Sequence, residues 1–188
     1  MMILYSGRGV DFMANVKKRL IIFTDIGDTI IDEGTEVRND QGVVIHADCI
    51  PGAKETYLRL YEAGYAIVMV ADGLNQSFRN TMRENGLDHI FSAWIISETV
   101  GEDKPSPKMF SAAMEAMGLT EADKKRILMI GNNVSRDIRG ANRFGLISVL
   151  LDWSKRRPFD EELPEDHADY RIHAPEDLLA LAERLENG

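Results

Sequence analysis

Apolar residues along this chain form short, nearly unbroken runs that alternate with segments of helical periodicity. The runs predict strands buried on both faces, as in parallel sheets, at residues 20–24, 66–70, 94–96, 127–130 and 146–151. Apolar positions recurring every three or four residues predict helices at 51–63, 75–85 and 107–117, another ending near 145, and a last one after 175. Strands alternating with helices predict an α/β fold, a three-layer α/β/α Rossmann-like parallel sheet.

The polar segment at residues 32–49 interrupts this alternation. The turn residues Asn39, Asp40 and Gly42 stand between two short β-prone pieces, a pattern typical of a hairpin. We therefore expect a small β-hairpin flap within one domain that covers residues 19–188. Residues 1–18 are expected to be an N-terminal extension, and residues 1–12 are interpreted as disordered or as the product of a misassigned start.

Composition and charge narrow the choice of partners. The 188 residues carry a formal net charge of −9, which argues against nucleic acid or an acidic membrane as a partner because both would be repelled. Cys49 is the single cysteine, and no signal peptide or membrane span is recognised, so we expect a cytoplasmic protein. The basic triplet at residues 155–157 is interpreted as a solvated loop, the alternative being a site for one anionic ligand.

Polar residues follow three of the predicted strands, at the edge where open parallel sheets bind ligands. They are Asp25, Asp28 and Thr29 after the first strand, Asp72 and Gly73 after the second, and Asn132, Asn133 and Asp137 after the strand at 127–130. Lys104 lies in a loop before a helix. Carboxylates hold a magnesium ion well, and a lysine beside them offsets the charge of a phosphate.

Four segments carry a specific resemblance, in order along the chain. They are Phe23–Thr29 (FTDIGDT), Val68–Gly73 (VMVADG), Gly101–Pro107 (GEDKPSP) and Ile130–Ile138 (IGNNVSRDI). Each alone is a weak match, but together they resemble the four motifs of the haloacid-dehalogenase-like (HAD-like) hydrolase superfamily. A receiver domain is the main competing fold, but its lysine follows a late strand, whereas Lys104 precedes the strand at 127–130.

The resemblance implies a role for each matching residue. Asp25 would be the nucleophile that forms an aspartyl-phosphate, and Lys104 would steady both the nucleophile and the phosphate. The second motif would bind the phosphate through Ala71, Asp72 and Gly73 together with Lys104. The implied cofactor is Mg²⁺, whose ligands would be Asp25, the Gly27 carbonyl, Asn132 and Asp137.

The resemblance also bears on the substrate. The intervals between the motifs are filled by predicted elements, so we expect a capless member whose site is covered only by the flap. Capless relatives act on bulky substrates or use a neighbouring subunit as a lid. The expected partner is therefore a small phosphorylated metabolite or a larger phosphorylated molecule. Assembly into a homo-oligomer is left as an open alternative.

Three positions depart from the family pattern. Gly27 replaces the aspartate that transfers protons, a role worth roughly 10²–10⁴-fold in rate. Ala71 replaces a phosphate-binding hydroxyl, and Asn132 replaces a metal-binding aspartate. Asp28 and Asp72 are alternatives for the missing acid–base group, although both are interpreted first as supports of local turns.

Two functions remain open at this point. The first is a Mg²⁺-dependent phosphomonoesterase that acts through an aspartyl-phosphate on Asp25. The second is a catalytically weak or inactive protein that keeps the fold to bind a ligand or a partner. The first rests on Asp25, Lys104 and Asp137 together, and the second rests on the three departures.

Overall fold

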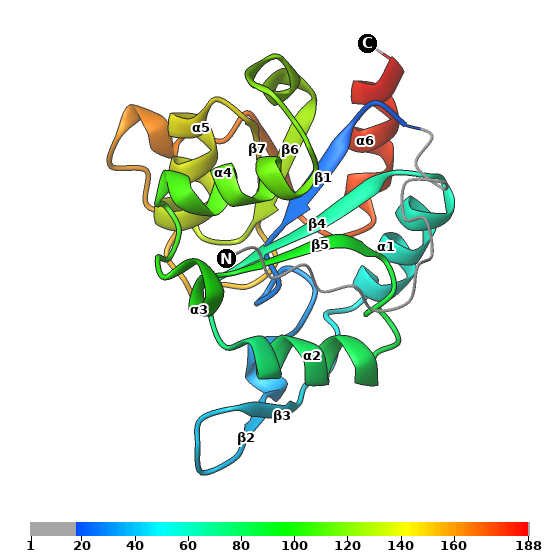
Figure 1. Cartoon of the computed structure of the whole chain (residues 1–188), viewed down its shortest axis with the longest axis vertical. Coiled ribbons are helices and arrows are strands. Elements are labelled where there is room, and N and C mark those ends of the chain that lie inside the picture. The colour runs from blue at the N-terminus through cyan, green and yellow to red at the C-terminus, as the bar shows by residue number, and fades with distance from the viewer. Residues whose placement is uncertain (1–17, 188) are drawn as a thin grey trace.

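A six-stranded sheet forms the centre of the computed structural model, which describes residues 18–187 (Figure 1). The strands are all parallel and lie in the order β5-β4-β1-β6-β7-β8. Their bounds are Ile21–Thr24 (β1), Ala66–Ala71 (β4), Phe91–Ile96 (β5), Ile127–Gly131 (β6), Ile147–Leu151 (β7) and Tyr170–Ile172 (β8). The predicted N-terminal extension covers residues 1–18, and all of it except Lys18 lies outside the described residues.

Helices follow most of the strands, as the alternating pattern predicted. The α-helices are Ala53–Glu62 (α1), Asn75–Glu84 (α2), Ser97–Val100 (α3), Pro107–Ala116 (α4), Arg139–Phe144 (α5) and Asp177–Asn187 (α6). Short 3-10 turns occupy Glu33–Thr35 (η2), Glu121–Arg126 (η3) and Pro164–Asp166 (η5), and a π-helical turn occupies Val134–Ile138 (η4). None of the helices within residues 18–187 combines the length and the apolar character that a membrane span needs.

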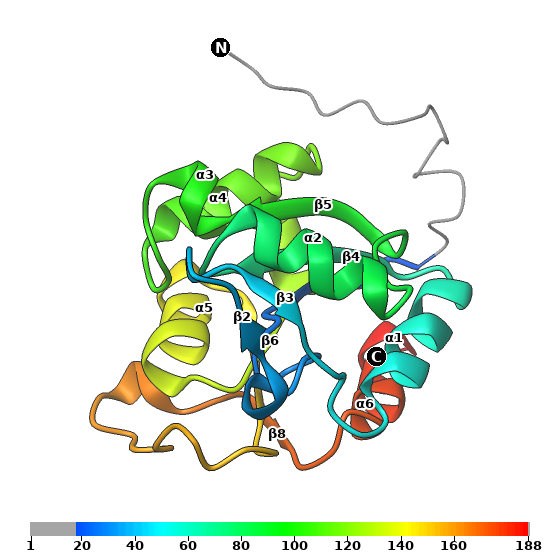
Figure 2. The same cartoon turned by 90° about the horizontal axis from the view of Figure 1, so that it is seen from below.

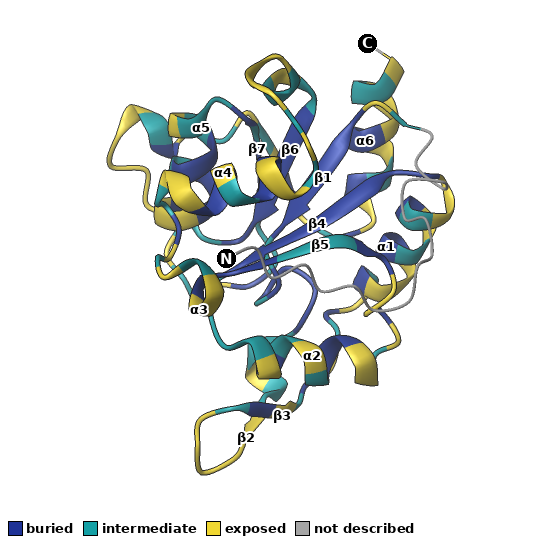
Figure 3. Ribbon diagram, viewed as in Figure 1, coloured by how far each residue is buried: buried dark blue, intermediate teal, exposed yellow. Residues whose placement is uncertain are grey.

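The helices form two outer layers, so the predicted three-layer α/β/α arrangement is confirmed (Figure 2). One apolar core joins the sheet to α1 and α6 through residues that include Tyr57, Leu60 and Leu178. The other core joins the opposite face of the sheet to α4 and α5 through residues that include Phe110 and Ala141. Burial on both faces explains why the strands are nearly continuous apolar runs (Figure 3).

The predicted hairpin is present as β2 (Val37–Arg38) and β3 (Val44–His46), which pair antiparallel. We call residues 32–49 the flap. It packs against α2, where the Val44 N–H donates to Ser77 Oγ at 3.0 Å and Asn80 Nδ2 donates to the Val44 carbonyl at 2.8 Å. These contacts place the flap beside the carboxyl ends of the strands (Figure 1).

Two strands differ from the sequence-based prediction. β5 begins at Phe91, three residues before the predicted start, and β8 was not predicted. β8 is a three-residue edge strand in which a buried Ile172 follows an exposed Arg171. So short a segment carries no readable periodicity, and its pairing with β7 decides its conformation.

Candidate active site

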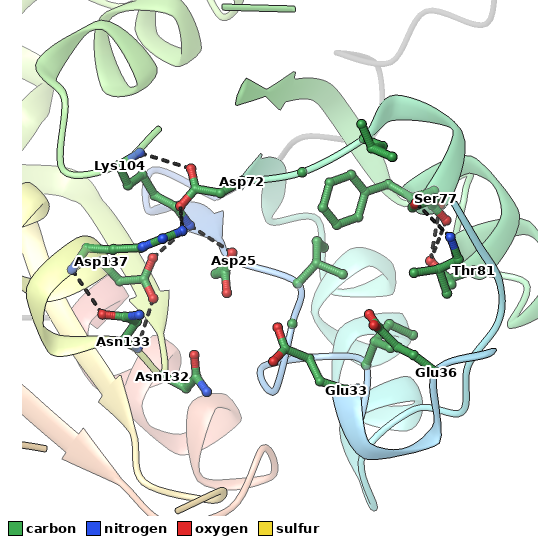
Figure 4. Close-up of a pocket in the computed structure, with 18 of the residues that line it drawn as sticks. Asp25, Glu33, Glu36, Asp72, Ser77, Thr81, Lys104, Asn132, Asn133 and Asp137 are labelled. Atoms are coloured by element: carbon green, nitrogen blue, oxygen red, sulfur yellow. Dashed lines mark hydrogen bonds and ion pairs between the residues drawn. The ribbon is translucent and has the colours of Figure 1, made fainter. Parts of the chain in front are cut away.

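The predicted site residues meet at one cavity at the carboxyl ends of β1, β4 and β6. Strand register brings these ends together, because Thr24 of β1 lies opposite Met69 on one side and Ile130 on the other. Seven of the eight predicted residues line the cavity (Figure 4): Asp25, Gly27, Asp72, Gly73, Lys104, Asn132 and Asp137. Segments far apart in the sequence thus supply one site.

Ala71 is the predicted site residue that the cavity does not include. It is the last residue of β4 and has no exposed surface. A methyl side chain at this position packs into the apolar interior, and Asp72 and Gly73 form the cavity wall in its place. The side chain of Ala71 therefore does not reach the cavity, and a role of this residue in binding stays a prediction.

Lys104 bridges two aspartates at the floor of the cavity. Its Nζ lies 2.7 Å from Asp25 Oδ1 and 2.7 Å from Asp137 Oδ1, and it donates to the Val70 carbonyl at 2.8 Å. Burial opposes the charge of Lys104, but Asp137, Asp25 and Asp72 outweigh this effect and raise the Lys104 pKa above its usual value. The ammonium is therefore a fixed positive charge beside Asp25.

Asp72 holds the backbone of Lys104 in place. Its Oδ1 accepts from the Lys104 N–H at 2.9 Å, and its Oδ2 lies 3.2 Å from Nη1 of Arg136 (Figure 4). Burial raises the pKa of Asp72, and the charge of Lys104 opposes that rise. The interpretation of Asp72 as a local support agrees with these contacts.

Asp137 reaches the floor because the chain makes a π-helical turn after β6. The Asn133 N–H donates to Asp137 Oδ2 at 3.0 Å. A side chain on Gly131 would collide with Asp137, since a β-carbon there would stand 2.7 Å from Asp137 Cβ. π-Helical turns occur often at functional sites because they re-aim side chains. Burial raises the pKa of Asp137, and the charge of Lys104 opposes that rise.

The backbone of Asp25 is anchored from two sides. Its N–H donates to the Ile130 carbonyl of β6 at 2.9 Å, and its carbonyl accepts from Thr24 Oγ1 at 2.7 Å. Thr24 Oγ1 also lies 2.6 Å from the hydroxyl of the buried Tyr57. Strand pairing and this buried contact leave Asp25 little freedom to shift relative to Lys104.

Asp28 has no place in the cavity wall. It is fully buried in a turn at φ +48°, and its Oδ1 accepts from the Glu33 N–H at 3.1 Å. Nη1 of Arg156 lies 2.5 Å from the same oxygen. Asp28 therefore stabilises the turn after β1, which removes it as a candidate for proton transfer.

Residues 155–157 lie at the surface, in agreement with their interpretation as a solvated loop, but two of them also form ion pairs. Arg156 pairs with Asp28 and, at 2.7 Å, with Asp32. Arg157 pairs with Glu33 at 2.9 Å. The two arginines are internal partners of the flap, a role that only the folded arrangement reveals.

Glu33 is a cavity residue that sequence reasoning missed, and Arg157, Asn133 and Arg136 line the same cavity. Glu33 enters from η2 at the base of the flap, with its carboxylate turned toward the cavity that holds Asp25 (Figure 4). Burial raises the pKa of Glu33, Arg157 opposes that rise, and the negative charges of Asp28 and Asp25 add to it. The signal in the sequence was weak, because Glu33 is one of several acidic residues in a polar segment.

The donor set at the floor fits a divalent metal that prefers oxygen. Asp25 and Asp137 supply carboxylates, the buried Asn132 can offer an amide oxygen, and Gly27 lines the same cavity. Oxygen ligands of this kind suit Mg²⁺. Within residues 18–187, no cluster of three or more His, Cys, Asp or Glu side chains has metal-binding geometry. A metal here would rely on backbone, amide and substrate oxygens as well.

The fold and the site together define a Rossmann-like α/β protein with an aspartate–lysine–aspartate centre at its strand ends. A family model described as haloacid dehalogenase-like hydrolase matches residues 5–145. The chain therefore belongs to the haloacid dehalogenase-like hydrolase family, and the resemblance of the four motifs is confirmed.

Curated relatives with related sequences are phosphatases by name. The chain is 30% identical over 140 residues to a glyceraldehyde 3-phosphate phosphatase of Methanopyrus kandleri. The matched region covers 74% of this chain and 57% of that protein. It is 34% identical to the Pyrococcus furiosus protein of the same name (74% and 56%) and 31% identical to a phosphoserine phosphatase of Thermus thermophilus (72% and 51%). The chain thus spans little more than half the length of these relatives.

Solved structures agree on the fold. A magnesium-bound HAD-hydrolase, YfnB from Bacillus subtilis, superposes with a TM-score of 0.70 over 88% of this chain and 99% of that chain, at 17% identity. A HAD phosphatase from Thermococcus onnurineus gives a TM-score of 0.70 over 86% and 97%, at 18% identity. At these identities, the likeness shows the fold alone.

Proposed function

We propose that this protein is a Mg²⁺-dependent phosphomonoesterase that works through an aspartyl-phosphate on Asp25. The observation that carries the proposal is the bridge from Lys104 to Asp25 and Asp137 at the cavity floor. A fixed ammonium beside a carboxylate orients that carboxylate and offsets the charge of an incoming phosphate. This is the arrangement that an attacking carboxylate needs.

The reaction would proceed in two displacements. In the first, an Asp25 carboxylate oxygen bonds to phosphorus while the bond from phosphorus to the ester oxygen breaks and the alcohol leaves. In the second, water attacks the aspartyl-phosphate, the bond from phosphorus to Asp25 breaks, and inorganic phosphate leaves. Lys104 offsets charge in both steps.

The residues that would hold Mg²⁺ are Asp25, Asn132, Asp137 and the carbonyl of Gly27. When bound, the ion would neutralise phosphate charge and orient the phosphoryl group toward Asp25. Lys104 lies between Asp25 and Asp137, and its positive charge offsets theirs. Asn132 adds an oxygen donor without a full negative charge, so we expect weaker magnesium binding than an aspartate at this position would give.

The proposed substrate class is a small phosphorylated metabolite. Relatives named for glyceraldehyde 3-phosphate and phosphoserine support this class. The part of the cavity between the flap and α2 adds apolar side chains, Val44 and Phe78 among them, beside the polar Ser77 and Thr81. A leaving group of mixed polarity would fit this wall.

A panel of phosphate monoesters with Mg²⁺ tests the proposal. Wild type is expected to release phosphate, and Asp25→Asn is expected to lose roughly 10⁶-fold in kcat, the size of loss that follows removal of a covalent nucleophile. Acid quench followed by mass spectrometry is expected to find a phosphoryl group on the wild-type peptide that contains Asp25. Equal rates for the two proteins would refute the assignment of Asp25.

A further inference from the structure

The first displacement leaves a negative oxygen on the departing alcohol, and the second removes a proton from water. Both steps therefore need a group that can give and take a proton. Five carboxylates line the cavity: Asp25, Glu33, Glu36, Asp72 and Asp137.

Four of these carboxylates are committed elsewhere. Asp25 is the proposed nucleophile, and Asp137 is held by Lys104 and by the Asn133 N–H. Asp72 fixes the backbone of Lys104, and Glu36 pairs with Arg38 on the flap. Glu33 also has a partner, the half-exposed guanidinium of Arg157, which contacts both carboxylate oxygens at 3.1 and 2.9 Å. What distinguishes Glu33 from the other four is its position over Gly27.

The position of Glu33 follows from the absence of a side chain on Gly27. A β-carbon on Gly27 would overlap Glu33 Oε1 and would stand 3.0 Å from Glu33 Cδ. The Glu33 carboxylate therefore lies directly over Gly27, two residues after Asp25 on the same cavity wall. The flap thus places a carboxylate over Gly27, in the cavity that also holds the nucleophile (Figure 4).

Resting on the proposed function, we propose that Glu33 is the general acid and base of this site. In the first displacement, the protonated Glu33 carboxyl gives its proton to the leaving oxygen as the ester bond to phosphorus breaks. In the second, the Glu33 carboxylate takes a proton from the attacking water as the bond from phosphorus to Asp25 breaks. Phosphate leaves, and Glu33 is protonated again for the next cycle.

Leaving-group dependence tests this role directly. Glu33→Gln is expected to slow hydrolysis of an alkyl phosphate, whose leaving alkoxide needs a proton, by about 10²–10⁴-fold. The same variant is expected to change the first displacement on 4-nitrophenyl phosphate far less, because nitrophenolate leaves without a proton. The readout is the rate of aspartyl-phosphate formation in single turnovers, plotted against the pKa of the leaving alcohol.

Asp48→Asn is the control, because it changes a carboxylate of the same flap that does not line the cavity. It is expected to leave the slope of that plot unchanged. A Glu33→Gln slope equal to the wild-type slope would overturn the inference. If wild type releases no phosphate from any ester, the proposed function fails as well. If wild type depends on Asp25 but not on Glu33, the inference alone fails.

A second test moves the carboxylate from position 33 to position 27 and measures both stability and activity. Gly27→Asp alone is expected to lower the melting temperature, because its side chain meets Glu33. In the double variant Gly27→Asp with Glu33→Ala, the collision is gone, so stability is expected to recover relative to Gly27→Asp. Alkyl phosphatase activity is also expected to exceed that of Glu33→Ala at least tenfold. If the double variant is no more active than Glu33→Ala, a carboxylate at position 27 does not take over the role of the Glu33 carboxylate.

Discussion

The floor of the cavity and the flap above it are built in different ways. The floor residues Asp25, Lys104 and Asp137 are tied to strand ends by backbone hydrogen bonds, and Lys104 and Asp137 are almost fully buried. The flap is held mainly by side-chain contacts with α2 and by ion pairs with Arg156 and Arg157.

This contrast separates two tasks. Charges buried in the floor interact strongly, because little water screens them, and strand pairing fixes their geometry. Ion pairs in the flap are half-exposed and more easily screened. The floor therefore suits the step that needs a fixed nucleophile, while the flap can bring Glu33 and the apolar wall to a substrate.

The largest expected effect concerns the floor. Lys104→Met would leave Asp25 and Asp137 without their shared cation, and breaking a buried pair costs about 3–5 kcal/mol of unfolding free energy. Without the lysine, burial holds the pKa of Asp137 above its unfolded value. The deficit should therefore grow as pH rises from 5 to 8, as measured by urea denaturation.

Lys108→Met is the control for this variant, since Lys108 is exposed and pairs with Glu102 at the surface. Its loss is expected to stay below about 1 kcal/mol at every pH. A Lys104→Met protein as stable as this control would show that the floor charges do not govern stability.

Arg156 tests how firmly the flap is tied to the domain. Arg156→Met would leave the buried Asp28 carboxylate unpaired, so we expect a clear loss of unfolding free energy. Lys155→Met, at the exposed neighbouring position, is expected to stay within about 0.5 kcal/mol of wild type. Chemical denaturation followed by circular dichroism measures both, and similar losses would refute the role given to Arg156.

The segment that carries these arginines is anchored farther along by Asp166, which accepts from Arg139 Nε at 2.7 Å and Nη2 at 3.0 Å. These hydrogen bonds lower the pKa of Asp166 to about 2. Because the folded pKa lies below the unfolded value of about 3.9, the stabilisation is complete above pH 4 and is lost as pH falls through 2.

Asp166→Asn is therefore expected to cost about 1.5–3 kcal/mol at pH 7, and the deficit should shrink between pH 4 and pH 2.5. Asp160→Asn, an exposed change in the same segment, serves as the control. Thermal melts across this pH range measure the effect. A deficit that is constant with pH would show that the Asp166 charge is not its source.

The smallest expected effect is at the outer edge of the flap. Glu36→Gln removes the ion pair with Arg38, whose guanidinium is 54% exposed. We expect a loss of less than about 1 kcal/mol, which 0.5 M NaCl should reduce further. A larger loss that resists salt would make the flap as rigid as the floor and would remove the contrast between them.

Much of the floor could be predicted from the sequence because its residues follow strongly apolar strands. The end of a buried strand is visible in the sequence, because the apolar run stops there. Parallel strands end at one edge of the sheet, so Asp25, Asp72 and Asn132 were expected to lie close together. The flap at residues 32–49 was also predicted, from its turn residues. That the side chain of Ala71 lies outside the cavity could not be predicted, because a position in a motif does not say which way a side chain points.

The sequence by itself determined the alternation of strands and helices, the family, and the aspartates and lysine at the strand ends, because these depend on short-range pattern and order. Only the tertiary structure decided that Arg156 and Arg157 are partners of the flap, that Asp28 is locked in a turn, and that Glu33 lies over Gly27. Those contacts join residues more than 120 positions apart, or fill a space that a missing side chain leaves. Side-chain packing in three dimensions creates such contacts, and no local pattern encodes them.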